Sequence, residues 1–406
     1  MLFCYCNNII GAHSQNITFP LMYWRLFVFS YKKTTLIYVE KCNKITVTII
    51  RKNQGNRLSI LRLLRNRGFL IISNLSGGSQ MSYKNYDGLM RHLRANGISI
   101  GGSKQKRQLM NTGYFHGYKG YRFFCDPSRR LPFTSYDEVY ATIQYDANLK
   151  SLFYSKVMYI ETAVKNIALE SILNKAHSES IQDMYDRAVS GYRNAPPYAD
   201  ENKKRKLQKE KLRLQKTIQD LLVREYGKGN RKVAHFYNHM SYNDVPIWAL
   251  VEIMMLGDFA QLLSCLTFDC REDISNKLGI SLRRDTDREL VYNYLYAMKD
   301  LRNAVAHNDV IFDTRFRNQD PTPAMTSTLE AEIGLPYVNF KTIGDYLILT
   351  CYYLKLLKVQ KTEISAFIRE FEKITDEYRH AVNPAVASMV IHPDLVSRIA
   401  ILKNYI

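Results

Sequence analysis

The chain of 406 residues lacks most of the short motifs that mark a cofactor or a metal site. Its seven cysteines form no Cys-x-x-Cys pair and no disulfide framework, a pattern typical of free thiols in a reducing compartment. No glycine-rich phosphate loop and no dinucleotide fingerprint occurs, so nucleotide-driven chemistry has no support. We therefore predict a cytoplasmic protein without a cofactor, in which any catalysis comes from side chains alone.

Long apolar runs are also missing. The run from Phe19 to Ser30 is interrupted by Pro20 and Arg25, and about twelve residues are too few to span a bilayer. No basic segment followed by a clean apolar stretch and a small-residue cleavage site precedes it, so a cleavable signal is not expected. The sequence predicts no membrane partner.

Acidic residues are almost absent from residues 1–80, where Glu40 is the single acid against eleven Lys and Arg. This segment therefore holds +10 of the formal net charge of +19. Helical and strand-like fragments follow one another there without a sustained pattern. Two codons for Gly77 and Gly78 can spell a ribosome-binding sequence before Met81. We predict that residues 1–80 are a non-native upstream extension; the alternative is a disordered basic arm.

From Met81 onward the patterns are helical, and the predicted fold is mainly α. A small basic lobe over residues 81–130 is expected to hold two helices, Tyr86–Ala95 and Ser103–Asn111, the second with Ser103 as its N-cap. Three basic side chains of this lobe are candidate RNA-binding residues, namely Lys104, Lys106 and Arg107.

A helical bundle is expected over residues 131–380, followed by a C-terminal tail over 381–406. Ser135-x-x-Glu138 is a capping box that opens a helix reaching about Asn174. A later helix is expected to begin at Asp285, and a proline-containing linker to cover residues 313–337.

A charged helical insertion is predicted at residues 196–232. Its most basic part, residues 203–216, holds eight Lys and Arg against Glu210, and its candidate RNA contacts are Lys203, Lys204, Arg205 and Lys206. No aromatic residue is interleaved, so the alternatives are phosphate contact or a solvated charged helix. His235 and His239 follow at i and i+4 without the Glu of a zinc protease, and no metal site is predicted.

One segment carries readable chemistry, the Arg-Asn-x-x-x-His pattern within Leu301–Asn308. Its apolar residues recur at helical spacing, and Asn303 and His307 fall on the opposite side of the helix, with Arg302 on the flank. The apolar stripe consists of Tyr294, Met298, Leu301 and Val305. An imidazole can move a proton near neutral pH, and a guanidinium can hold phosphoryl oxygens. The alternative is a surface arginine and a helix-terminal histidine without a shared role.

The order of five motifs resembles the Abi-like family of abortive-infection proteins, of the AbiD and AbiF type, and the last motif resembles that of HEPN ribonucleases. The motifs are Met110–Phe124, Tyr145–Lys150, Tyr159–Lys165, Pro246–Glu252 followed by Gly257, and the Arg302 helix. The likeness runs from about Tyr83 to about Arg379. The family usually has an RLSGYW-like string where this chain has Phe115–Tyr121, which puts a role for His116 in doubt.

The resemblance implies a HEPN-like helical bundle that acts as a metal-independent, antiviral endoribonuclease. His307 would then be the general acid or base, Arg302 would stabilise the phosphorane, and Asn303 would position the groups. Glu161 would bind Arg302 in support; the alternative is a solvated carboxylate. A homodimer is expected, because one chain has one such motif and the reaction uses two titrating groups. RNA and a neutralising antitoxin or small RNA are the expected partners. The competing hypothesis is a non-cleaving module that binds RNA or protein.

Overall fold

The computed structural model describes residues 84–196, 198–239 and 244–406, together with the backbone of six β-strands between residues 13 and 75. The chain divides into two compact units, Met1–Lys84 and Asn85–Ile406. Each unit is described by itself.

The strands of the first unit form one antiparallel sheet in sequence order. They are β1 (His13–Thr18), β2 (Trp24–Tyr31), β3 (Thr34–Lys41), β4 (Lys44–Lys52), β5 (Leu58–Asn66) and β6 (Phe69–Leu75). No sustained element was expected here, and the strands differ from that expectation. Residues of β-branched type, frequent in β3 and β4, favour strands. Whether translation naturally begins at Met81 stays a prediction.

The predicted mainly α fold is confirmed for the second unit, in which the described residues form fifteen α-helices and two π-helical segments. Its N-terminal lobe holds α1 (Tyr86–Ala95), α2 (Gly102–Thr112) and the π-helical η1 (Gly113–Lys119). The expected start of the second helix was wrong, because Gly101 is the extended N-cap and Ser103 lies inside α2. The first helix has the predicted bounds and is capped by Asn85.

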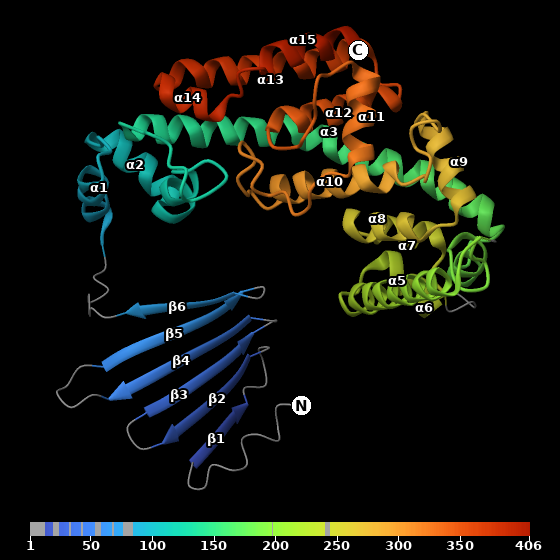
Figure 1. The fold of residues 1–406 in the computed structure, drawn as a ribbon, viewed down its shortest axis with the longest axis horizontal. Helices are drawn as coiled ribbons and strands as arrows, with labels where there is room; N and C mark the ends of the chain where they lie inside the picture. Colours follow the sequence, from blue (N-terminus) through green and yellow to red (C-terminus); the bar gives the residue numbers. More distant parts are fainter. Residues whose placement is uncertain are drawn as a thin grey trace. The chain divides into compact units, whose positions relative to one another are not determined.

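Helix α3 (Tyr136–Ala176) is the central element of this unit. The predicted capping box is present, since Ser135 and Glu138 bind each other's backbone. The helix continues without a break to Ala176. Figure 1 shows α3 between α13 (Lys361–Ala381) and α10 (Leu290–Ala306), and it contacts both, as well as α9 (Phe268–Leu278). Apolar residues on several sides of α3 are buried, as expected for a core helix.

The charged insertion is helical, as predicted. After the short α4 (Ile181–Asp183) and η2 (Met184–Ala188) come α5 (Glu201–Gly227) and α6 (Arg231–His239). The second half of α5 buries Leu214, Ile218 and Leu221 and packs on α8 (Leu256–Cys265), which follows α7 (Ile247–Ile253). Helix α8 in turn packs on α10, so the insertion is joined to the motif helix through one intervening layer.

Two expectations about helix boundaries near the motif were wrong. Helix α10 begins at Leu290 and not at Asp285, because the buried Asp285 carboxylate accepts hydrogen bonds from the backbone N–H groups of Glu289 and Leu290. The expected linker over 313–337 contains α11 (Pro323–Ile333). Its proline occupies the first turn, where no backbone donor is required.

The expected C-terminal tail is also helical. After α12 (Ile343–Leu356) and α13 come α14 (Pro384–Val390) and α15 (Leu395–Tyr405). Arg398 of α15 pairs with Asp345 of α12, and both side chains are buried. This ion pair attaches residues 381–406 to the core. Among the described helices, none is by itself long and apolar enough to cross a membrane; α14 and α15 meet that test only as a pair bent by 46°.

Candidate functional site

The motif lies where α10 ends. The apolar stripe of the helix is buried, with Tyr294 and Leu301 fully inside, whereas Asn303 and His307 are exposed as predicted. His307 is the C-cap, and Asn308 follows in the left-handed conformation with φ of 58°. The Asp309 N–H then donates to the Ala304 carbonyl at 2.8 Å. The left-handed conformation of Asn308 that ends the helix in this way is one that asparagine tolerates well.

Arg302 is held by a buried carboxylate of α3. Its Nε donates to Glu161 Oε2 at 3.1 Å, and Lys165 donates to Glu161 Oε1 at 3.0 Å. Lys165 also donates to the Met254 carbonyl at 2.6 Å. The structure therefore realises the first of the two alternatives for Glu161, contact with Arg302. The Glu161 carboxylate, itself bound by Lys165, therefore fixes the guanidinium at its Nε.

The other edge of the guanidinium faces Asn303. Arg302 Nη1 lies 3.4 Å from Asn303 Oδ1, and the Arg302 side chain is 22% exposed. Within the described part of the chain, Arg302 Nη2 has no hydrogen-bond partner. This edge can therefore accept an anion, because a planar guanidinium fork suits phosphoryl oxygens.

A second buried cluster on α3 holds the end of the motif. Lys150 pairs with Asp146 at 2.9 Å and donates to Asn308 Oδ1 at 2.6 Å. The other oxygen atom of the fully buried Asp146 carboxylate accepts the backbone N–H groups of Ile311 and Phe312, each at 2.8 Å. The chain leaving α10 is thus tied to α3 through one carboxylate.

The N-terminal lobe is tied to the same carboxylate. The Tyr121 hydroxyl donates to the Asp146 carboxylate at 2.7 Å. Burial of this hydroxyl is the main cause that raises the pKa of Tyr121, and the nearby Asp146 charge is the next. Its ring stacks on Phe312 with centroids 6.0 Å apart. A second clamp forms where Asp313 accepts the Cys125 backbone N–H at 2.6 Å. These contacts fix the segment after η1 against the segment after the motif.

The lobe brings one further imidazole to the motif. His116 of η1 is exposed, and its Nε2 lies 3.3 Å from Asn308 Nδ2. A role for His116 was put in doubt by its sequence context, and none was predicted for Lys150, Asp146 or Asn308. A signal was present in the repeated acid-x-x-x-Lys spacing of α3, since 146/150 and 161/165 both place an acid and a lysine one turn apart.

The predicted basic residues do not join this cluster through a hydrogen bond or ion pair within the described residues. On α2, Lys106 pairs with Asp87 at 2.7 Å, while Lys104 and Arg107 are exposed. On α5, Arg205 pairs with Glu201, and the Lys203 ammonium lies 5.3 Å from the Tyr198 ring. Lys206 is exposed and Lys204 is half-buried. Their part in RNA binding stays a prediction.

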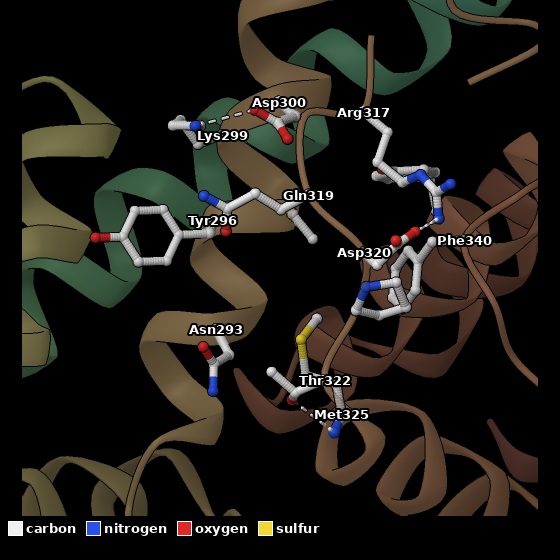
Figure 2. Close-up of a pocket in the computed structure, with 13 residues that line it drawn as sticks. Asn293, Tyr296, Lys299, Asp300, Arg317, Gln319, Asp320, Thr322, Met325 and Phe340 are labelled. Atoms are coloured by element: carbon white, nitrogen blue, oxygen red, sulfur yellow. Dashed lines mark hydrogen bonds and ion pairs between the residues drawn. The ribbon is translucent and has the colours of Figure 1, made fainter. Parts of the chain in front are cut away.

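A small pocket lies on the motif helix, one to two turns before the motif (Figure 2). Tyr296 and Asp300 line it, and they precede Asn303 and His307 by seven residues each, so they share one side of α10. The Asp300 carboxylate also accepts hydrogen bonds from the backbone N–H and the side-chain amide of Asn318, at 3.0 and 2.8 Å. The pocket holds about 40 Å³, room for about one or two water molecules and not for a nucleotide.

The sequence pattern of the Abi-like protein family matches residues 107–313, about half of the chain. The chain belongs to the Abi-like protein family. The matched segment begins in α2 and ends at Asp313, so it contains η1, α3 and the whole motif helix of this Abi-like protein. Membership of this family indicates a role in abortive infection, a form of phage defence. Comparison with curated proteins and with solved structures finds no match.

Proposed function

We propose that this Abi-like protein is a metal-independent endoribonuclease of an abortive-infection system. The observation that carries the proposal is the Arg302 guanidinium, which Glu161 holds at one edge while the other edge stays open beside Asn303. His307 lies five residues further on at the exposed helix end. A fixed cation and an exposed imidazole at the end of one helix suit attack on a phosphodiester.

The proposed reaction is an internal transfer within RNA. The ribose 2′-oxygen attacks phosphorus, so the P–O2′ bond forms while the P–O5′ bond breaks. A general base takes the 2′-hydroxyl proton, and a general acid gives a proton to the leaving 5′-oxygen. His307 serves in this proton transfer, Arg302 stabilises the phosphorane, and Asn303 positions the guanidinium. The products carry a 2′,3′-cyclic phosphate and a 5′-hydroxyl.

Arg302 also supports a second candidate, a non-cleaving module that binds RNA or protein. The observation that favours this alternative is the same ion pair, because a buried Glu161–Arg302 contact also serves the packing of α10 on α3. In that case Arg302 and His307 matter for stability or binding and not for chemistry. The expected homodimer, antitoxin and small RNA stay predictions, and sedimentation at several concentrations tests the first.

The deciding experiment incubates purified protein with a labelled RNA pool in the presence of EDTA. We expect cleavage that leaves 2′,3′-cyclic phosphate ends, and we expect His307→Ala to abolish it while RNA binding remains. His380→Gln is the matched control, since His380 is an exposed histidine on α13 outside the motif. Cleavage that EDTA abolishes and Mg²⁺ or Mn²⁺ restores contradicts the mechanism. RNA binding without cleavage by the wild-type chain favours the non-cleaving module.

A further inference from the structure

A second histidine lies at the motif although 192 positions separate it from its contact there. His116 belongs to the π-helical turn η1, and its Nε2 is 3.3 Å from the amide nitrogen of Asn308. Asn308 directly follows His307. One chain therefore brings two imidazoles to the same end of α10.

The hydrogen bonds around Asn308 determine which form of His116 faces the site. The Lys150 ammonium can only donate, so the Asn308 atom at 2.6 Å from it must be the carbonyl oxygen. The amide nitrogen of Asn308 then faces His116 and donates to it. The ring nitrogen Nε2 must accept this bond, and it carries a lone pair. In this arrangement Nε2 is the ring nitrogen without a proton, the atom able to take one.

The charged groups around this contact come from several elements. From α3, Lys150 and Asp146 face it as a buried pair. From the segment after α10 comes the exposed Asp309, whose carbonyl also accepts a bond from Lys150 at 3.4 Å. From the lobe itself, the Tyr121 ring packs edge-on against His116 at 6.4 Å, and Tyr121 is in turn bonded to Asp146. Two contacts, with Asn308 and with Tyr121, therefore hold the ring of His116.

The backbone that carries His116 is unusual. Seven residues of η1 are π-helical, a rare geometry that is frequent at functional sites. Gly117 permits it, because a Cβ there would lie 2.9 Å from the Thr112 hydroxyl oxygen. The same turn presents Phe115 with 82% of its surface exposed. An exposed aromatic ring directly before His116 in the chain offers a platform on which a nucleobase can stack.

We infer that His116 is the second proton-transfer group of the site. The inference rests on the proposed ribonuclease function. It assigns both proton transfers to one chain, unlike the two-chain arrangement that the single motif predicts. His116 Nε2 takes the proton of the 2′-hydroxyl, which replaces the Asn308 amide as its hydrogen-bond donor. His307 gives its proton to the 5′-oxygen as the P–O5′ bond breaks. A single-stranded RNA segment, with one base on Phe115, is the substrate that this arrangement fits.

The first test compares His116→Gln with His380→Gln in the full chain, using the labelled RNA of the cleavage assay. We expect kcat/KM to fall by about 10²-fold to 10⁴-fold for His116→Gln, with RNA affinity and melting temperature close to those of the wild type. Imidazole added to His116→Ala should restore part of the activity. The inference is overturned if His116→Gln has the kcat/KM and the pH profile of the wild type while His307→Ala is inactive. That result leaves the ribonuclease proposal standing. No cleavage by the wild type rejects both.

The second test leaves His116 in place and changes its partner. Asn308→Asp replaces the amide donor with a carboxylate, which accepts a hydrogen bond from the His116 ring and stabilises the imidazolium. The acidic limb of the pH–rate profile should therefore move up by about one pH unit or more. An unmoved limb contradicts a base at His116. Mixing impaired His116→Gln chains with inactive His307→Ala chains should raise the activity no further, because each site takes both groups from one chain. Restored activity would overturn that assignment.

Discussion

Two acid–lysine pairs on α3 have the same spacing and chemistry but hold different parts of the molecule. Asp146–Lys150 and Glu161–Lys165 each place a carboxylate and an ammonium one helical turn apart, and all four side chains are buried. They stand fifteen residues apart, about 22 Å along the helix. Both reach the motif, the first through Asn308 and the second through Arg302.

The difference lies in what each carboxylate accepts. Asp146 binds two backbone N–H groups and the Tyr121 hydroxyl, so it holds the chain path and the lobe. Glu161 binds two cationic side chains, Lys165 and Arg302, so it holds a functional group. The same pair is therefore a backbone anchor at one point of α3 and a side-chain support at the other.

The largest expected effect is that of Asp146→Ala. The substitution leaves the buried Lys150 ammonium, two backbone donors and the Tyr121 hydroxyl without their acceptor, and removing one partner of a buried ion pair costs about 3–5 kcal/mol. We expect a loss of that size in the free energy of unfolding, measured by urea titration. Asp146→Asn keeps an acceptor oxygen for the backbone and should cost less. Equal losses in the two variants would contradict the anchoring role.

Glu161→Gln should lower the free energy of unfolding by less than Asp146→Ala does, and it should affect activity more than stability. The neutral amide no longer neutralises Lys165 and Arg302, and a hydrogen bond to a charged group contributes about 1.5–3 kcal/mol. Under the proposed function, cleavage falls further than stability, because Arg302 is no longer held toward the phosphate. Glu170→Gln is the matched control on the same helix, since Glu170 is 66% exposed and 3.5 Å from Lys277. Full activity in Glu161→Gln would show that Arg302 needs no support.

Asn308→Gly should change stability by less than about 1 kcal/mol, because glycine adopts the left-handed backbone without strain. Asn308→Val removes the same amide but places a β-branched residue at φ of 58°, and should cost about 1–3 kcal/mol. Thermal melting of the two variants separates the backbone requirement from the amide. Equal melting temperatures would mean that the helix end does not depend on this conformation.

The smallest effect on stability is expected outside both pairs, in α5. Changing Lys203, Lys204, Lys206 and Lys209 to Gln should leave the melting temperature unchanged, since the first half of α5 is largely exposed. If these residues contact phosphates, RNA binding weakens and its dependence on salt concentration flattens, because counterion release scales with the phosphates neutralised. An unchanged slope identifies a solvated charged helix and confines RNA contact to the rest of the chain.

Much of the local structure followed from the sequence. The capping box at Ser135, the bounds of α1 and the exposure of Asn303 and His307 all agree with the prediction, because caps and apolar periodicity act within a few residues. Helices α11, α14 and α15 were missed, since prolines and weak periodicity resemble a linker or a tail. The start of α10 was missed because a side chain, Asp285, occupies the donors of the preceding turn.

The sequence by itself determined the mainly helical fold, the family and the Arg-Asn-x-x-x-His face. Only the tertiary structure decided what this face meets. Glu161 reaches Arg302 across 141 positions and His116 reaches Asn308 across 192, contacts that no local spacing encodes. The first contact arises because a buried carboxylate of α3 must find donors wherever the packing brings them. The second follows because Asp146 of α3 binds both Tyr121, which follows η1, and the backbone after the motif.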